Sequence, residues 1–386
     1  MNTNTHAIDP IHQLGTNPTK PGRLAFAFGL SLATLLLLTS PGSAASFFFT
    51  TGDPDGKIAT LSRPPGAGKI QTETADDFTL TNCIVINQAT ITGLIPSAAP
   101  LTSIQNVEVE IYRLFPGQPG DTDPTNTIVP NPIVPTRTGS PADFEIDDAT
   151  RDGLAGSLSF SPTLLSSSFT AANSVANNIK RQTNQFTGGE GAVAGEEVRI
   201  TISFDPPIAL PPGHYFFRPE VQLSSGDFLW LSAPKPIPAP ADLQSWIRSD
   251  LTPDRGGIFP NWLRIGTDIT HQGPFNAAFS LSGETDADCD EVGDSLDLCP
   301  NTPSGTIVNA DGCSIEQLAP CAGPAPGVSW KSHGEYVSAV AQAAESFLDA
   351  GLISADQKDA IVVQAAQSAC GVKSRITAAR ILPDLE

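Results

Sequence analysis

Short runs in which apolar and polar residues alternate occupy residues 46–283. A period of two is typical of strands with one buried face. Pro and Gly clusters separate the runs and are turn-formers that a central strand does not tolerate. The clearest runs are residues 89–94, 107–114, 198–204, 214–217, 228–231 and 275–281. The pattern therefore predicts a mainly β fold, with a large, jelly-roll-like β-sandwich over residues 46–283.

Two proline-rich segments interrupt the alternation. Residues 116–142 read as a loop that crosses the surface, and residues 234–260 read as a second turn region around a short piece at 243–248. Long ordered loops of this kind either hold binding sites or decorate the surface.

The period changes in the last part of the chain. Residues 335–348 place their apolar side chains on one helical stripe, and Gly351 suits a left-handed helix end. Ser354 and Gln357 have the spacing of a capping box that begins a second helix. We expect a small helical hairpin at residues 321–372, followed by a tail at 373–386.

The N-terminal residues 1–45 have the form of an export signal. Lys20 and Arg23 precede an apolar run of residues 24–38, and small residues follow up to Ala45. The run has the length of a signal-peptide core and is short for a membrane span. An uncleaved N-terminal anchor is the alternative. No later stretch is apolar enough to cross a bilayer, so we expect a protein that is secreted or held at the cell envelope.

The formal net charge of −20 repels nucleic acid, so DNA and RNA are excluded as expected partners. Few charged residues overall, with many Pro, Gly, Ser and Thr, fit an extracellular β protein. The expected partner is an unidentified extracellular protein or polysaccharide.

The most specific motif lies between the two folded parts, at residues 284–320. Five carboxylates fall at positions 1, 3, 5, 9 and 12 of a twelve-residue window, and these are positions from which a loop ligates calcium, with a backbone carbonyl at position 7. The candidate ligands are Asp286, Asp288, Asp290, Asp294 and Asp297, with the carbonyl of Val292. A solvated acidic linker is the alternative interpretation. We expect Ca²⁺ as the ligand, because an ion relieves the mutual repulsion of the five side chains.

The aspartate series and the residues that follow it resemble a thrombospondin type-3 repeat, a module found in many exported bacterial proteins. The match continues through Cys299-Pro300, Pro303, Gly305 and Asp311-Gly312-Cys313. The resemblance implies calcium binding in an extracellular linker or stalk. The chain departs from the family at Glu291, where Gly is favoured, and at Cys289 within the loop.

Residues 47–283 also resemble exported bacterial β-rich proteins of unassigned activity. The matching segments are residues 51–57, 73–78, 188–191, 214–217 and 225–236. This resemblance implies export and a sandwich, and it supplies no reaction. The segment around Cys321 and Trp330 is similar to a helical module that follows such repeats.

All six cysteines lie beyond the signal, and an oxidising compartment favours disulfides. We predict the pairs Cys299–Cys313 and Cys321–Cys370. Cys83 and Cys289 either bridge the two parts of the chain or stay as free thiols.

Two other functions are alternatives to a calcium-binding structural or adhesion-type protein without catalysis. Trp246 and Trp262, in loop-rich sequence beside Arg248 and Arg264, are candidates for exposed rings that stack on a glycan in a carbohydrate-binding protein. Packing of both rings in the core is the alternative. A glycoside hydrolase would need a pair of carboxylates such as Asp53 and Asp77. The acidic residues 53–77 are also what ordinary turns contain. The sequence contains no catalytic signature, and it therefore favours the calcium-dependent linker.

Overall fold

The computed structural model divides the chain into two compact units, residues 1–41 and 42–386, and the residues it describes all belong to the second. They are residues 45–66, 68–96, 99–114, 139–150, 158–177, 179, 187–234, 244–249 and 262–373. The predicted signal peptide up to residue 44 and residues 374–386 of the predicted tail lie outside this set.

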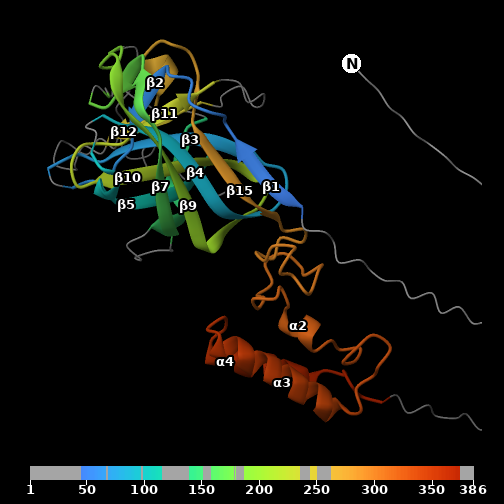
Figure 1. Cartoon of the computed structure of the whole chain (residues 1–386). Helices are drawn as coiled ribbons and strands as arrows, with labels where there is room; N and C mark the ends of the chain where they lie inside the picture. The colour runs from blue at the N-terminus through green and yellow to red at the C-terminus, as the bar shows by residue number, and fades with distance from the viewer. Residues whose placement is uncertain are drawn as a thin grey trace, which may run out of the picture. The chain divides into compact units, whose positions relative to one another are not determined.

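The described residues form the predicted mainly β architecture with two sheets (Figure 1). The first is nine-stranded and runs in the order β1-β15-β4-β11-β2-β8, with β9 beside β4, β7 beside β9 and β14 beside β11. Its strands are β1 (Ser46–Thr50), β2 (Ile58–Leu61), β4 (Ile84–Ile95), β7 (Leu158–Ala171), β8 (Asn173–Val175), β9 (Val193–Leu210), β11 (Leu229–Ala233), β14 (Asn276–Ala277) and β15 (Phe279–Thr285). Among these pairs, only β2 and β8 run parallel.

The second sheet is six-stranded and antiparallel, in the order β13-β12-β3-β10-β5-β6. Its strands are β3 (Thr72–Leu80), β5 (Ile104–Leu114), β6 (Pro141–Thr150), β10 (Gly213–Leu223), β12 (Trp246–Ser249) and β13 (Leu263–Arg264). Short helical turns η1 (Leu101–Ser103) and η3 (Ile265–Ile269) precede β5 and follow β13.

The two sheets pack face to face through the alternate apolar positions that the sequence pattern marks. The main core joins Ile91, Ile200 and Phe279 of the nine-stranded sheet to Val109 and Phe217 of the six-stranded sheet. The rings of Phe217 and Phe279 stack with centroids 5.3 Å apart. Because side chains alternate across a strand, the residues between these core positions lie on the outer faces of the two sheets.

Three helices follow the aspartate loop, namely α2 (Ile315–Leu318), α3 (His333–Asp349) and α4 (Ala355–Gln367). The predicted capping box is present at Ser354 and Gln357, and Gly351 adopts φ +73° between α3 and α4. Buried Val340 and Ala365 pack the two long helices together. The helical hairpin prediction is therefore confirmed. None of the helices in the described part of the chain has the length and apolarity needed to span a membrane.

Candidate metal centre

The aspartate loop begins where β15 ends and is attached to the turn before β4. The backbone N–H of Asp286 donates to the carbonyl of Cys83, with 3.1 Å between N and O. Cys83 is also disulfide-bonded to Cys289 inside the loop. Of the two alternatives for these cysteines, the structure therefore has the bridge. The bridge ties the loop to the sandwich at the residue between Asp288 and Asp290.

Asp286 organises the first turn of the loop. Its carboxylate accepts backbone N–H groups from Cys289 at 2.8 Å, from Asp290 at 3.3 Å and from Glu291 at 2.9 Å. This wrapping needs a left-handed backbone at Cys289 (φ +62°) and at Glu291 (φ +77°). The short Asp side chain thus folds the chain around itself, as Asp commonly does in turns.

Asp286, Asp288 and Asp290 converge, and each offers a carboxylate oxygen within 4.8 Å of the other two. Asp290 is only 4% exposed. Its Oδ1 accepts the N–H of Val292 at 2.9 Å, and its Oδ2 is buried with no hydrogen-bond partner in the described part of the chain. Buried polar atoms are normally satisfied, so an orphaned carboxylate oxygen beside two other carboxylates fits a bound cation.

The electrostatics of the loop agree with this fit. Burial and the negative charges of Asp288, Asp297 and Asp286 raise the pKa of Asp290 to about 6. Burial also raises the pKa of Asp286 and of Asp297. A hard divalent cation would offset both the lost hydration and the repulsion.

The other predicted ligands serve the loop in different ways. Asp294 accepts the backbone N–H of Ala287 at 2.8 Å and the hydroxyl of Thr285. Asp297 accepts the N–H of Cys299 at 2.7 Å. Ligation by Asp294, Asp297 and the Val292 carbonyl stays a prediction.

Gly312 marks where Asp290 and Asp297 come together. A Cβ built on Gly312 would lie 2.2 Å from Oδ1 of Asp297 and 3.2 Å from Oδ2 of Asp290. The backbone of the Asp311-Gly312-Cys313 segment therefore closes over these two carboxylates, which explains why Gly is required there.

The rest of the loop is fixed covalently and by one polar side chain. The structure pairs Cys299 with Cys313 and Cys321 with Cys370, as the sequence predicts. The side chain of Gln317 on α2 donates to the carbonyl of Cys299 at 3.0 Å and accepts the Thr302 hydroxyl at 2.8 Å. Asp288 in turn accepts the N–H of Thr302 at 2.6 Å. These bonds link the carboxylate cluster to α2.

The glycan-stacking hypothesis for Trp246 and Trp262 is wrong, and both rings are packed in the core. Trp246 is fully buried and Trp262 is 2% exposed. The cause is a strand that the proline-rich sequence concealed, since β12 pairs with β3 and places Trp246 opposite Ala75. Trp262 lies beneath the guanidinium of Arg248, with 4.5 Å between the Arg248 Cζ and the ring centroid. Neither indole offers a free face for a sugar ring.

Asp53 and Asp77, the candidate carboxylate pair of a glycoside hydrolase, lie in different environments. The Asp53 side chain is 92% exposed and lies 3.6 Å from Arg199 of the nine-stranded sheet. Asp77 is buried on β3 of the six-stranded sheet, where it pairs with His214 and accepts the N–H of Gln244 at 3.1 Å. Asp55 caps a turn by accepting the N–H of Lys57 at 3.0 Å. The turn interpretation accounts for Asp55.

The sequence pattern does not predict the buried charge network that the six-stranded sheet contains. Arg218 on β10 has a fully buried side chain and pairs with Glu110, Glu220, Glu108 at 3.4 Å and Glu73 at 3.7 Å. Burial, with the neighbouring Glu110 carboxyl, raises the pKa of Glu108 to about 8. The sequence does place charged residues at alternate positions, 108 and 110 on one strand and 218 and 220 on another. Strand periodicity alone assigns such residues to the solvent-facing side of a sheet.

Neither a protein-family model nor a curated protein matches this chain.

Proposed function

We propose that this is an exported, non-catalytic, calcium-binding structural protein whose aspartate loop captures one Ca²⁺ and stiffens the connection between the sandwich and the helical hairpin. The observation that carries the proposal is the buried, unpartnered Oδ2 of Asp290 beside Asp286 and Asp288. Oxygen donors of this kind suit a hard cation better than a soft metal.

The attachments of the loop support a mechanical role. On one side the Cys83–Cys289 bridge holds the loop to the sandwich. On the other side Gln317 and Thr302 connect it to α2. An ion that holds Asp286, Asp288 and Asp290 together would restrict the chain between these two attachments.

Calorimetric titration of the purified protein with calcium chloride tests the proposal. We expect one site with a Kd of about 10⁻⁴–10⁻³ M, the range of extracellular modules. Asp290→Asn keeps the shape of the side chain and removes its charge. The change should weaken calcium binding at least ~10-fold, because loss of a residue that only hydrogen-bonds to a metal ligand already lowers metal affinity by that factor. Asp311→Asn is the matched control, because Asp311 is exposed and outside the three-carboxylate cluster. No heat of binding at millimolar calcium, or equal affinity in both variants, would refute the site.

Limited proteolysis tests the mechanical role separately. Chelation of calcium should speed cleavage between residues 284 and 320, because the loop loses the contacts that order it. The cleavage rate within α3 and α4 serves as the internal reference. If the loop were cleaved equally fast with and without chelator, calcium would bind without stiffening the linker.

A further inference from the structure

The outer face of the nine-stranded sheet carries two parallel rows of uncharged side chains, which are all polar except for Phe48. Strands β1, β15, β4, β9 and β7 lie next to one another in that order (Figure 1). The pairing registers align one residue of each strand into a row. The first row is Thr50, Ser280, Thr90, Thr201 and Ser161, and the second is Phe48, Ser282, Gln88, Ser203 and Ser159.

These side chains face away from the core. Their strand neighbours, such as Ile91, Ile202 and Leu281, are buried between the sheets, whereas Ser159 and Ser161 are exposed and Thr201 is half-buried. The hydroxyls of Thr90 and Ser280 bond to each other at 2.7 Å. Five strands are separated by four steps of ~4.8 Å, so each row extends over about 19 Å, the length of a short oligosaccharide.

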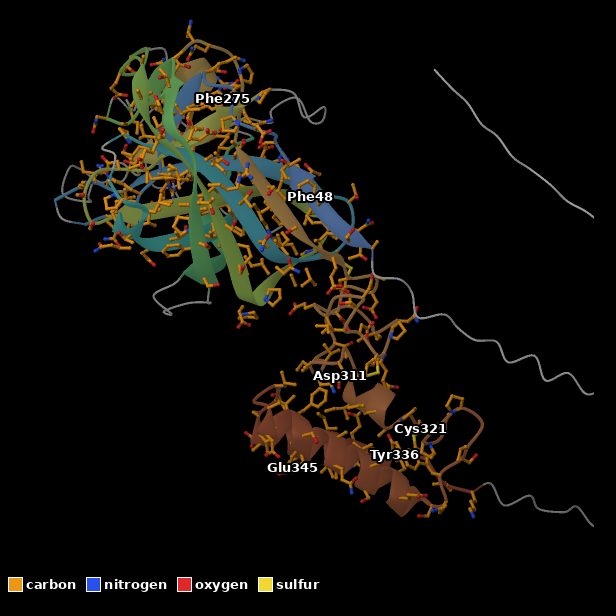
Figure 2. The ribbon with its side chains drawn as sticks, in the orientation of Figure 1. Phe48, Phe275, Asp311, Cys321, Tyr336 and Glu345 are labelled. Carbon is orange, nitrogen blue, oxygen red and sulfur yellow. A yellow bond between two sulfur atoms is a disulfide. The ribbon has the colours of Figure 1, made fainter. Side chains whose placement is uncertain are left out.

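An aromatic ring ends the second row, and an ion pair lies beside the rows. Phe48 on β1 is 67% exposed (Figure 2). It borders a shallow groove of about 220 Å³ together with Thr50, Thr90, Ser280, Asp53 and Arg199. The Asp53–Arg199 pair is solvent-exposed at 3.6 Å, so neither group is committed to a strong interaction.

The geometry points to a binding site for a neutral polysaccharide on this face. Sugar rings present an apolar face to an aromatic side chain and hydroxyls to polar ones, and the groove offers both kinds of contact. The rows themselves contain no charged residue, and a chain of net charge −20 repels polyanions. A protein partner is disfavoured, because protein interfaces have an apolar, aromatic-rich centre, whereas here Phe48 is the only aromatic side chain among the ten row residues.

Affinity electrophoresis of the purified protein is the test. The native protein is run through gels that contain a neutral polysaccharide, namely mixed-linkage glucan, arabinoxylan or galactomannan, or the anionic polysaccharide alginate. We expect at least one neutral polysaccharide to retard the protein and alginate to leave it unretarded. Phe48→Ala should lower the affinity at least fivefold, and Thr201→Glu should do the same by placing a charge within the first row. Val363→Ala, an exposed apolar residue on α4, is the matched control and should run as the native protein does.

Gels run with calcium and with chelator separate this site from the aspartate loop, because the sheet face contains none of the loop carboxylates. The inference is overturned if no neutral polysaccharide retards the protein. It is also overturned if both face variants are retarded as strongly as the native protein, or if Phe48→Ala instead abolishes self-association seen by gel filtration.

Discussion

At the scale of single residues, the aspartate loop depends on an unusual backbone at Glu291. Its φ of +77° lies in the left-handed region, where an L side chain brings its Cβ too close to the carbonyl oxygen. The N–H of Glu291 nevertheless has to reach Asp286 Oδ2, and this bond of 2.9 Å fixes the conformation. Gly would adopt this backbone without that clash, because it has no Cβ.

Glu291→Gly should therefore stabilise the loop. Removing the Cβ relieves a strain of ~1–2 kcal/mol, while the freer unfolded chain costs ~0.5–1 kcal/mol, so we expect a net gain of roughly 0.5–1 kcal/mol. Chemical denaturation followed by fluorescence measures it. Gln342→Gly on the exposed side of α3 is the opposite control and should lose about 1 kcal/mol. A loss of stability in Glu291→Gly would contradict the strain argument.

At the scale of elements, the six-stranded sheet carries a charge network whose protonation affects stability. Four carboxylates surround Arg218, and the pKa of Glu108 is raised from 4.5 to about 8, chiefly by burial. In the unfolded chain Glu108 loses its proton near its ordinary pKa, whereas in the folded chain it keeps the proton up to about pH 8. The contribution of Glu108 to the free energy of unfolding therefore falls as the pH rises from about 4.5 to 8.

Glu108→Gln should flatten this pH dependence, because Gln mimics the protonated carboxyl at every pH. We expect the variant to be more stable than the native protein at pH 9 and similar to it at pH 5. Denaturant midpoints measured across this range provide the comparison. Glu196→Gln on β9, which no contact joins to the Arg218 network among the described residues, should leave the slope unchanged. Parallel curves for native protein and Glu108→Gln would show that Glu108 is ionised well below pH 8.

Periodicity predicts best the elements that have apolar residues on one face and polar residues on the other. Residues 107–111 and 198–204 alternate strictly and lie in β5 and β9, and the helical stripe at 335–348 lies in α3. Strand β12 has four residues among prolines, too few to show a period, and its pairing with β3 is what buries Trp246. Periodicity also cannot show what covers an outer face. Arg218 and Thr201 are both polar residues at outward-facing strand positions, so the pattern does not show that Arg218 is buried and that the rows around Thr201 are not.

At the scale of the whole molecule, the Cys83–Cys289 bridge joins positions separated by 206 residues. The sequence left this pair open, because their meeting depends on the whole sandwich returning β15 beside β4. The carboxylate spacing of the aspartate loop, by contrast, is local, so the sequence shows it directly. In the chain-entropy model a loop of this length stabilises by ~5 kcal/mol.

Replacing both cysteines, as Cys83→Ser with Cys289→Ser, should weaken calcium binding at least tenfold, because the bridge holds the residue between Asp288 and Asp290. Calcium calorimetry on the double variant measures this, and circular dichroism checks that the sheets remain. The Cys321→Ser with Cys370→Ser variant is the control, since that bridge closes the helical hairpin beyond the aspartate loop. Unchanged calcium affinity in the first variant would mean that the loop holds its shape without the bridge.

The Cys83–Cys289 bridge also determines whether cleavage of the backbone in the sandwich separates the protein into two fragments. A protease that cuts once anywhere between residues 84 and 288 leaves two chains that are still joined through sulfur. The nicked protein would keep its full mass on a gel run without reductant and separate into two fragments only when reduced. In an oxidising medium, damage to the β layers would therefore not release the aspartate loop or the helices that follow it.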